Sequence, residues 1–513
     1  MGYSMKVTVY CTEKNKTEIG KIAAADLHEP ADFVTYEELR KGDGALIADH
    51  ELVNTLRKDE AAGYSPVYIY FKNRLFDISQ ADQLVEERRS LVEEKDWSGA
   101  KDINEVLCDI DFLCRNTVNR SYPDFFQIES TDFCNSRCIM CEHYFTRNKD
   151  AQILQMETLE HMRDAIQLSR RINLNGMGEP FISSLVKQQI DLYVGYGNKI
   201  VANTNLSVLD DELIGRIGRD FEWLAISVDG ARKETYESIR IGMSYETLIR
   251  NLYKLKEKVP HVKKIISMVM MRQNVCEMPE LVELAHEVGA DQVVFLNLNP
   301  NLIIGNAQDV MLNYPKTAQY YSAKAMEKGK ELGVHVVAAN APDPGVELCF
   351  DDIRDELGKM QSMPMWKSAE EEQEMLKTAG IVNKYIETHD QEQNTTVPTN
   401  VRCSGVCDWL LKNCYADLHG NISMCCRNLI YRAGNVEKEG DFLSVWNAPL
   451  LKKCREIFYS GYVPEACLKC GMIESGELKY LTADITPDFY KDTALKKKQK
   501  QELKTLLGGP HDL

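Results

Sequence analysis

The chain has 513 residues, more than a single hydrophobic core usually serves, so we expect two or three domains. Hydrophobic residues make up 44% of it, enough for sizeable packed cores. The formal net charge of −17, from 78 acidic and 61 basic residues, argues against nucleic acid or an anionic membrane surface as the main partner.

The first ten residues lack the apolar core of a signal peptide, and no run of about 18 apolar residues occurs anywhere. We therefore expect a cytoplasmic protein. Disulfides are rare in such a reducing compartment, and the sixteen cysteines cluster at 134–141 and 403–470, which favours metal binding. For five scattered cysteines we expect the role of small buried apolar residues: Cys11, Cys108, Cys114, Cys276 and Cys349.

Residues 1–120 differ in character from the rest of the chain. Segments 6–10 and 67–71 are rich in β-formers and predict strands, whereas 82–94 is charged and helix-prone. This pattern predicts a small α+β domain. Two roles stay open for it: docking of a substrate or partner, or covering one edge of the next domain.

Residues 121–340 alternate short β-prone segments with helical ones, as in parallel βαβ units. We expect strands at 125–129, 172–174, 199–203, 223–228, 265–271 and 292–296, with a further candidate at 334–337. We expect helices at 153–168, 186–194, 210–217, 245–256, 278–288 and 317–332. Six such units form an open (β/α)6 barrel, whose active site would lie at the carboxyl ends of the strands.

Residues 341–401 contain several prolines, an acidic run at 368–374 and a polar end, which predicts a connector with a solvated helix. Cysteines return over 402–475, and this stretch predicts a third, cysteine-rich domain. The tail, 476–513, contains a lysine-rich stretch that we interpret as a surface helix.

Three cysteines lie within eight residues, directly after the first strand expected in the barrel: Cys134, Cys138 and Cys141. Three thiolates are one too few for a closed zinc site or a fully ligated cubane, so the triad suits a [4Fe-4S] cluster with one open iron. The alternative is a zinc site with a remote fourth ligand such as His143.

The spacing Cys-x3-Cys-x2-Cys, with the apolar Met140 before the last cysteine, resembles the signature of the radical S-adenosylmethionine (radical SAM) superfamily. The resemblance implies a partial (β/α)6 barrel in an α/β chain, and S-adenosylmethionine bound to the open iron. It also implies reductive cleavage to a 5′-deoxyadenosyl radical, with electrons from a donor such as flavodoxin or ferredoxin.

Further motifs follow the expected strands. Asn175-Gly-Met-Gly-Glu-Pro180 is similar to the family motif that binds the amino group of the cofactor, which implicates Gly176, Gly178 and Glu179. Asn203 and Asn205 stand where many members contact the ribose or the carboxylate. An ordinary loop role stays open for each of these residues.

The segment from Ala225 to Arg240 resembles the Ser-x-Asp-Gly…Tyr…Arg segment of the superfamily branch that has a C-terminal cluster domain. By that resemblance Ser227 and Arg240 would hold the carboxylate of the cofactor. Leu296, at the end of a later expected strand, is a candidate for contact with the adenine. The alternative for Arg240 is a surface ion pair with Glu234 or Glu237.

The stretch 402–475 resembles a SPASM or twitch domain, an auxiliary-cluster module found behind some radical SAM barrels. The implied ligands of one auxiliary [4Fe-4S] cluster are Cys407, Cys425, Cys467 and Cys470, and Cys426 can replace Cys425. No cysteine follows Cys470, so a single auxiliary cluster is expected. A second cluster on the remaining cysteines, or a four-cysteine zinc ribbon, stays open.

By this resemblance we expect a radical SAM oxidoreductase-type enzyme, with no nucleic acid and no membrane partner. The single-cluster domain favours oxidation or epimerisation of a small polyhydroxylated or sugar-like metabolite. The alternative is a maturase that crosslinks or oxidises a peptide or protein docked on the N-terminal domain.

Overall fold

The computed structural model describes residues 7–27, 31–35, 45–55, 64–141, 143, 152–298, 309–339, 348–362, 370–371, 373–374, 377, 396, 398–402, 407–426 and 432–467. The predicted helix of the tail, residues 368, 369 and 372 of the acidic run, and Cys470 lie outside these residues. No helix in the described part of the chain is both long enough and apolar enough to cross a bilayer.

The N-terminal sheet has the strand order β2-β1-β3-β4-β5. Its strands are β1 (Val7–Tyr10), β2 (Ala31–Phe33), β3 (Ala45–Asp49), β4 (Val67–Phe71) and β5 (Arg74–Asp77). The first four are mutually parallel, and β5 returns antiparallel to β4. The two predicted strands are confirmed as β1 and β4.

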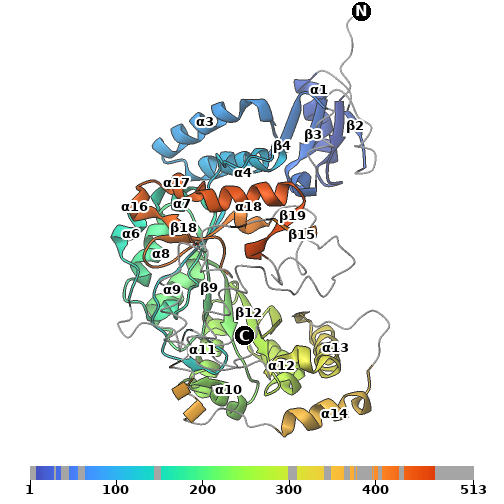
Figure 1. The fold of residues 1–513 in the computed structure, drawn as a ribbon, viewed down its shortest axis with the longest axis vertical. Coiled ribbons are helices and arrows are strands. Elements are labelled where there is room, and N and C mark those ends of the chain that lie inside the picture. Colours follow the sequence, from blue (N-terminus) through green and yellow to red (C-terminus); the bar gives the residue numbers. More distant parts are fainter. Residues whose placement is uncertain are drawn as a thin grey trace, which may run out of the picture.

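Both faces of this sheet are covered by helices. Alternate residues of β3 point to opposite faces, so Ala45 and Ile47 pack toward α1 (Lys16–Asp26), whereas Leu46 and Ala48 pack toward the other side. That second side is covered by α3 (Ala81–Glu93) and α4 (Trp97–Leu113). Figure 1 shows α4 between this sheet and the rest of the molecule.

Seven parallel strands form the central sheet in the order β14-β13-β12-β10-β9-β8-β6. They are β6 (Phe125–Ile128), β8 (Arg171–Asn173), β9 (Lys199–Thr204), β10 (Phe221–Ser227), β12 (Lys263–Met270), β13 (Gln292–Asn297) and β14 (His335–Ala338). The predicted partial (β/α)6 barrel is confirmed, because each predicted strand is present and all of them run parallel.

The connecting helices cover the outside of this sheet. The long ones are α8 (Val186–Gly195), α9 (Asp211–Asp220), α11 (Tyr245–Lys258), α12 (Met278–Glu287) and α13 (Pro315–Leu332). α9 shows why the pattern was predictable: Leu213, Ile214 and Ile217 fall on one face and are buried, while Asp210 caps the first turn by accepting from the Leu213 amide at 2.7 Å.

The prediction of one helix over 153–168 is wrong. Ile153 bridges to Thr131 and the Leu154 amide donates to the Ser130 carbonyl at 3.0 Å, so the segment starts extended beside β6. Two short helices follow, α6 (Met156–Glu160) and α7 (Arg163–Leu168). A pairing distant in sequence has overridden local helix propensity.

Three further expectations need correction. The stretch 341–401 contains a packed helix, α14 (Phe350–Gln361), which buries Ile353, Leu357 and Met360 near α13.

Two of the scattered cysteines, Cys276 and Cys349, are exposed rather than buried, whereas Cys108 is buried as expected.

The C-terminal cysteine-rich segment extends the central sheet. β16 (Asn413–Ala416) pairs in parallel with β6, and β17 (Asn421–Ser423) and β18 (Arg432–Asn435) continue antiparallel from it. The helices α16 (Val436–Glu439), α17 (Phe442–Trp446) and α18 (Pro449–Tyr459) pack behind, and β15 (Pro398–Arg402) pairs with β19 (Tyr462–Pro464). The sheet therefore has ten strands.

Arg455 of α18 ties this segment to the N-terminal part of the chain. Its guanidinium is fully buried and donates to the carbonyls of Leu410 at 2.7 Å, Trp446 at 2.9 Å and Thr117 at 3.1 Å. Burial lowers the pKa of Arg455 to about 10. Figure 1 shows α18 directly below α4, in agreement with this contact.

A charged cluster joins the N-terminal domain to the barrel. The ring of His50 contacts Asp109 through Nδ1 and Glu105 through Nε2, and Arg170 also donates to Glu105. Burial by itself would lower the pKa of His50, but its bonds to the two carboxylates outweigh burial and raise the pKa to about 10. His50 is therefore a cation at neutral pH.

We predict that this cluster makes stability depend on pH through His50. Its folded pKa of about 10 exceeds the ordinary value of 6.5, so its contribution is complete below pH 6.5 and is lost as the pH rises through 10. His50→Gln should lower the free energy of unfolding at pH 6 by roughly 1.5–3 kcal/mol, because it removes a cationic hydrogen-bond partner from Asp109 and Glu105, which keep Lys412 and Arg170.

The measurement is urea unfolding at pH 6 to 10. The difference between wild type and His50→Gln should shrink as the pH rises, while His286→Gln, an exposed position on α12, should follow wild type. A constant difference between wild type and His50→Gln across this range would refute the role of His50.

Candidate functional site

The three clustered cysteines lie on one loop at the carboxyl end of β6. The loop includes the short strand β7 (Arg137–Cys138), which pairs antiparallel with β11 (Arg240–Ile241) so that Cys138 stands opposite Arg240. The Cys141 amide donates to the Cys138 carbonyl at 3.0 Å, which turns the chain back on itself. Cys138 is buried, and Cys134 and Cys141 are half-buried.

Two hydrogen-bond partners lie beside the sulfur of Cys138, and of these Arg240 is a donor. The Ser136 hydroxyl lies 3.0 Å from this sulfur, and Nη1 of Arg240 lies 3.7 Å from it. Donors of this kind stabilise a thiolate and raise the reduction potential of an iron–sulfur cluster that the thiolate binds. Burial raises the pKa of Cys134 to about 11, so the metal-free loop holds that residue as a thiol.

Among the described residues, no group of three or more His, Cys, Asp or Glu side chains is arranged around a single metal ion. In a [4Fe-4S] cluster each cysteine binds its own iron. A donor set of three cysteines, one of them with two hydrogen-bond partners, fits such a cluster. Nε2 of His143 already lies 2.5 Å from the Asp132 carbonyl oxygen.

Arg240 is fixed by a carboxylate that the motif analysis gave no role. Nε of Arg240 donates to Oδ2 of Asp229 at 2.6 Å, and Nη2 lies 2.6 Å from the same oxygen. Oδ1 of Asp229 accepts from the Val269 amide at 2.7 Å. Both side chains are buried, so the surface ion pair of Arg240 with Glu234 or Glu237 is wrong.

The two glycines of the 175–180 loop pack against the cysteine loop and its strand. A Cβ atom at Gly176 would lie 2.3 Å from Cγ of Glu129, and one at Gly178 would lie 2.3 Å from the Thr131 carbonyl oxygen. Oε1 of Glu129 accepts from the Met177 amide at 2.5 Å. The glycines therefore permit a close approach of two protein segments, whatever they contribute to a ligand.

Glu179 connects the second and third strands of the barrel. Its Oε1 accepts from the Thr204 hydroxyl at 2.6 Å, and its Oε2 accepts from the Asn205 amide at 2.6 Å. Burial raises its pKa, and the hydrogen bonds from Asn205 and Thr204 oppose that effect. Nδ2 of Asn205 donates to Asn135 at 3.0 Å, so this network reaches the cysteine loop.

The remaining residues with an implied cofactor role also lie at this edge. Ser227 is the last residue of β10, and Asn203 is the last residue but one of β9. Both side chains are half-buried. Leu296 near the end of β13 is 41% exposed, an unusual exposure for a strand leucine. Met140 packs against a small apolar cluster that contains Ile139 and Ile239. The structure thus gathers these residues at one edge and leaves their ligand contacts as predictions.

Three of the four implied auxiliary ligands lie in described segments. Cys407 precedes a short 3₁₀ helix (Asp408–Leu410) and is half-buried, Cys425 follows β17, and Cys467 ends a 3₁₀ turn (Glu465–Cys467) after β19. Cys425 and Cys467 are buried. Cys470 and Cys403 lie outside the described residues.

Two other cysteines of this segment belong to the hydrophobic core. Cys414 is 1% exposed and donates weakly to the Tyr415 carbonyl, and Cys454 is fully buried with its sulfur 3.5 Å from that of Met424. Burial raises the pKa of Cys454 to about 12. Both residues behave as apolar side chains in the metal-free chain.

Four residues of this site had no assigned role in the motif analysis: Glu129, Ser136, Thr204 and Asp229. Asp229 belongs to the Ser-x-Asp-Gly segment, Thr204 stands between Asn203 and Asn205, and Ser136 lies within the cysteine loop, two residues from Cys138. The contacts of Glu129 and Thr204 join segments far apart in the chain, which a single sequence does not reveal.

Gly178→Ala should destabilise the protein by roughly 1–3 kcal/mol, because its methyl group would collide with the backbone of Thr131 and Phe133. The measurement is urea unfolding of the metal-free chain. Gly215→Ala is the matched control: a Cβ atom there meets nothing within 4 Å, and in helix α9 it should stabilise by up to about 1 kcal/mol. Equal effects of the two changes would contradict the packing of the loop.

Curated relatives align with part of this chain. One is the mycofactocin maturase MftC of Mycolicibacterium smegmatis, 26% identical over 32% of this chain and 41% of that protein. Another is the tungsten-containing aldehyde ferredoxin oxidoreductase cofactor-modifying protein of Pyrococcus furiosus, 26% identical over 34% of this chain and 52% of that protein. The matches therefore span about half of each relative.

Among solved structures, Streptococcus suis SuiB is similar with a TM-score of 0.47 and 15% identity, over 70% of this chain and 73% of that one. Residues 128–285, which include the cysteine loop and the strands whose ends surround it, match the profile of the Radical SAM superfamily. The barrel segment that carries the cysteine loop is therefore similar to the radical SAM superfamily.

Proposed function

We propose that the chain uses a [4Fe-4S] cluster on Cys134, Cys138 and Cys141, together with S-adenosylmethionine, to abstract a hydrogen atom from its substrate. The observation that carries the proposal is the position of Cys138, between the Ser136 hydroxyl and Arg240 at the carboxyl edge of the barrel. When bound, the cluster and the cofactor supply a 5′-deoxyadenosyl radical by one-electron reduction of the sulfonium.

The chain itself orients and shields this chemistry. Asp229 holds Arg240 beside Cys138, and the Glu179 network holds the third strand against the cysteine loop. The apolar cluster with Ile139 and Ile239 packs under the loop and excludes water from that side. Exclusion of water protects a radical from competing hydrogen donors.

We assign the cofactor to the same edge of the barrel. The residues proposed to contact it are Gly176, Gly178, Glu179, Asn203, Asn205, Ser227, Arg240 and Leu296. Two nitrogens of Arg240 are engaged by Asp229, and Nη1 donates to the Cys138 sulfur, so the second hydrogen of Nη1 is its proposed donor for a cofactor carboxylate.

For the substrate we propose a peptide or protein. The support is the name of a relative, the mycofactocin maturase, and the separate N-terminal domain as a place for docking. The second candidate is oxidation or epimerisation of a small polyhydroxylated metabolite, favoured by the apparent single auxiliary cluster. A short precursor peptide encoded beside the gene would favour the first, and neighbouring glycosyltransferase genes the second.

One auxiliary [4Fe-4S] cluster on Cys407, Cys425, Cys467 and Cys470 is the other part of the proposal. The near-complete enclosure of Cys414 and Cys454, 1% and 0% exposed against 9% for Cys425 and 8% for Cys467, supports one cluster over two. A fully ligated cluster there would accept the electron that remains after hydrogen abstraction. A protein of flavodoxin or ferredoxin type would supply the initial electron.

Reconstituted, reduced protein should form 5′-deoxyadenosine from S-adenosylmethionine, and Cys138→Ala should reduce the rate at least a hundredfold, because the initiating cluster loses a ligand. The product is measured by liquid chromatography. Cys276→Ala, at an exposed position, is the matched control and should retain the wild-type rate. No product from wild type would sink the catalytic proposal.

Iron content should separate one auxiliary cluster from two. A variant with Cys134, Cys138 and Cys141 all changed to alanine should retain about four irons per chain after reconstitution, because one cubane binds to four cysteines. Retention of about eight irons would overturn the single-cluster assignment. Binding of about one zinc and no iron would favour the zinc ribbon.

A further inference from the structure

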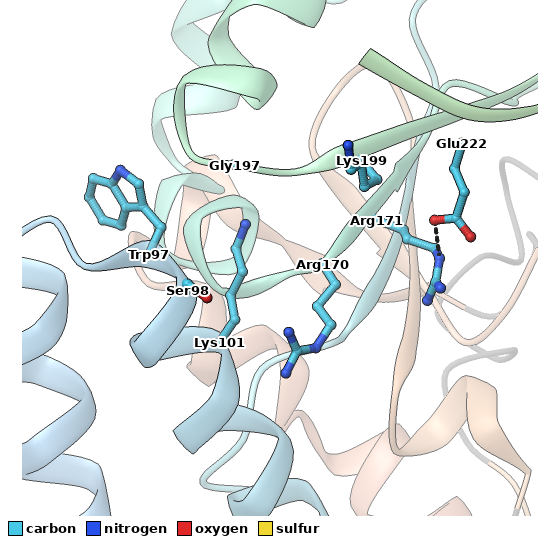
Figure 2. A pocket seen from close by; sticks show the side chains of 8 residues that line it. All are labelled: Trp97, Ser98, Lys101, Arg170, Arg171, Gly197, Lys199 and Glu222. Carbon is cyan, nitrogen blue, oxygen red and sulfur yellow. Dashed lines mark hydrogen bonds and ion pairs between the residues drawn. The ribbon is translucent and has the colours of Figure 1, made fainter. Parts of the chain in front are cut away.

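A pocket of about 250 Å³ lies where α4 meets the amino edge of the barrel sheet, the edge opposite to the cysteine loop. Arg171 and Lys199 are the first residues of β8 and β9, and Glu222 is the second residue of β10. α4 contributes Trp97 and Lys101 from its first two turns. Figure 2 shows Lys101 rising from α4 toward the backbone at Gly197.

Lys101 is a buried cation without a carboxylate partner. Its side chain belongs to a residue that is 4% exposed, and its Nζ donates to the Tyr196 carbonyl at 2.7 Å. Among the described residues, no Asp or Glu lies within ion-pair distance of it. Burial, reinforced by the charge of Arg170, lowers the pKa of Lys101 to about 8, so the ammonium is present at neutral pH at a cost.

Of the other three cations of the pocket, two have carboxylate partners and one has none among the described residues. Arg170 pairs with Asp102 and Glu105, and Arg171 pairs with Glu222. Lys199 is exposed and makes no ion pair with the described residues. Arg170 also lies 3.5 Å from Asp124, so three carboxylates surround it, and Lys101 and Lys199 are the pocket cations that make no ion pair with the described residues.

We propose that this pocket binds the phosphate group of a small anionic molecule. A phosphate monoester carries about −1.5 to −2 charges at pH 7 and three strong acceptor oxygens, which matches two free ammonium groups. A carboxylate would neutralise only one of them. The volume holds a phosphate with a small attached group, for which Trp97 forms an apolar wall.

The simpler alternative is that Lys101 only ties α4 to the barrel through the Tyr196 carbonyl. A neutral donor would make that bond without the desolvation of a charge, and Lys199 would then have no relation to it. The two readings differ in what inorganic phosphate does to the protein. The site is remote from the cysteine loop, so its test is independent of the proposed radical chemistry.

The experiment is calorimetric titration of the full-length chain with inorganic phosphate at pH 7 and constant ionic strength, with acetate as the carboxylate probe. Wild type should bind phosphate saturably and acetate at least tenfold more weakly. Lys101→Met and Lys199→Gln should each weaken phosphate binding at least tenfold. Lys258→Gln, which removes an exposed lysine of α11, should bind as wild type does.

Thermal unfolding without phosphate provides the folding control. Lys101→Met should melt no lower than wild type, because it removes an uncompensated buried charge; if that variant fails to fold, the exposed Lys199→Gln decides alone. The proposal is overturned if wild type shows no saturable binding, if acetate binds as tightly as phosphate, or if a folded Lys101→Met or Lys199→Gln variant retains wild-type affinity.

Discussion

The buried ion pair between Asp229 and Arg240 fixes the cysteine loop on the barrel. Removing two charges from water costs several kcal/mol for each ion, so such a pair is tolerated only when further hydrogen bonds complete it. The Val269 amide completes the carboxylate, and the Cys138 sulfur lies against the free nitrogen of the guanidinium. Arg240 is also the residue opposite Cys138 in the pairing of β11 with β7. The ion pair and the strand register therefore both place Arg240 beside Cys138.

Two more carboxylates assemble the same edge by accepting amide protons from the neighbouring loop. Glu129, after β6, accepts from Met177, and Glu179, after β8, accepts from Asn205. Glu129 is 3% exposed, and this burial raises its pKa to about 7. Each carboxylate thus joins one strand end to the next. The edge is a chain of charge-assisted hydrogen bonds that leads from the first strand to the cysteine loop.

The barrel could be predicted because its signals are local. Each strand is a short apolar run, and helices such as α9 carry their buried residues at helical spacing beside a capping aspartate. The cysteine spacing likewise located the site. The break of the predicted helix at 153–168 was not predictable, since it depends on the pairing of Ile153 with Thr131. The partner of Arg240 was missed for the same reason: sequence spacing pointed to a helical neighbour, while the fold provided Asp229.

The cysteine-rich segment is joined to the barrel sheet through the parallel pairing of β16 with β6. This pairing places the cysteine-rich segment at the side of the strand that leads into the cysteine loop, so both cysteine groups depend on the same sheet edge. Arg455 fastens that segment to Thr117: its guanidinium donates to carbonyl and amide oxygens and lies 4.9 Å from the centre of the Trp446 ring. A buried guanidinium satisfied in this way tolerates little displacement, because every lost bond leaves a desolvated donor. The pairing of β16 with β6 and the bonds of Arg455 therefore hold the C-terminal segment against the barrel sheet and the chain before it.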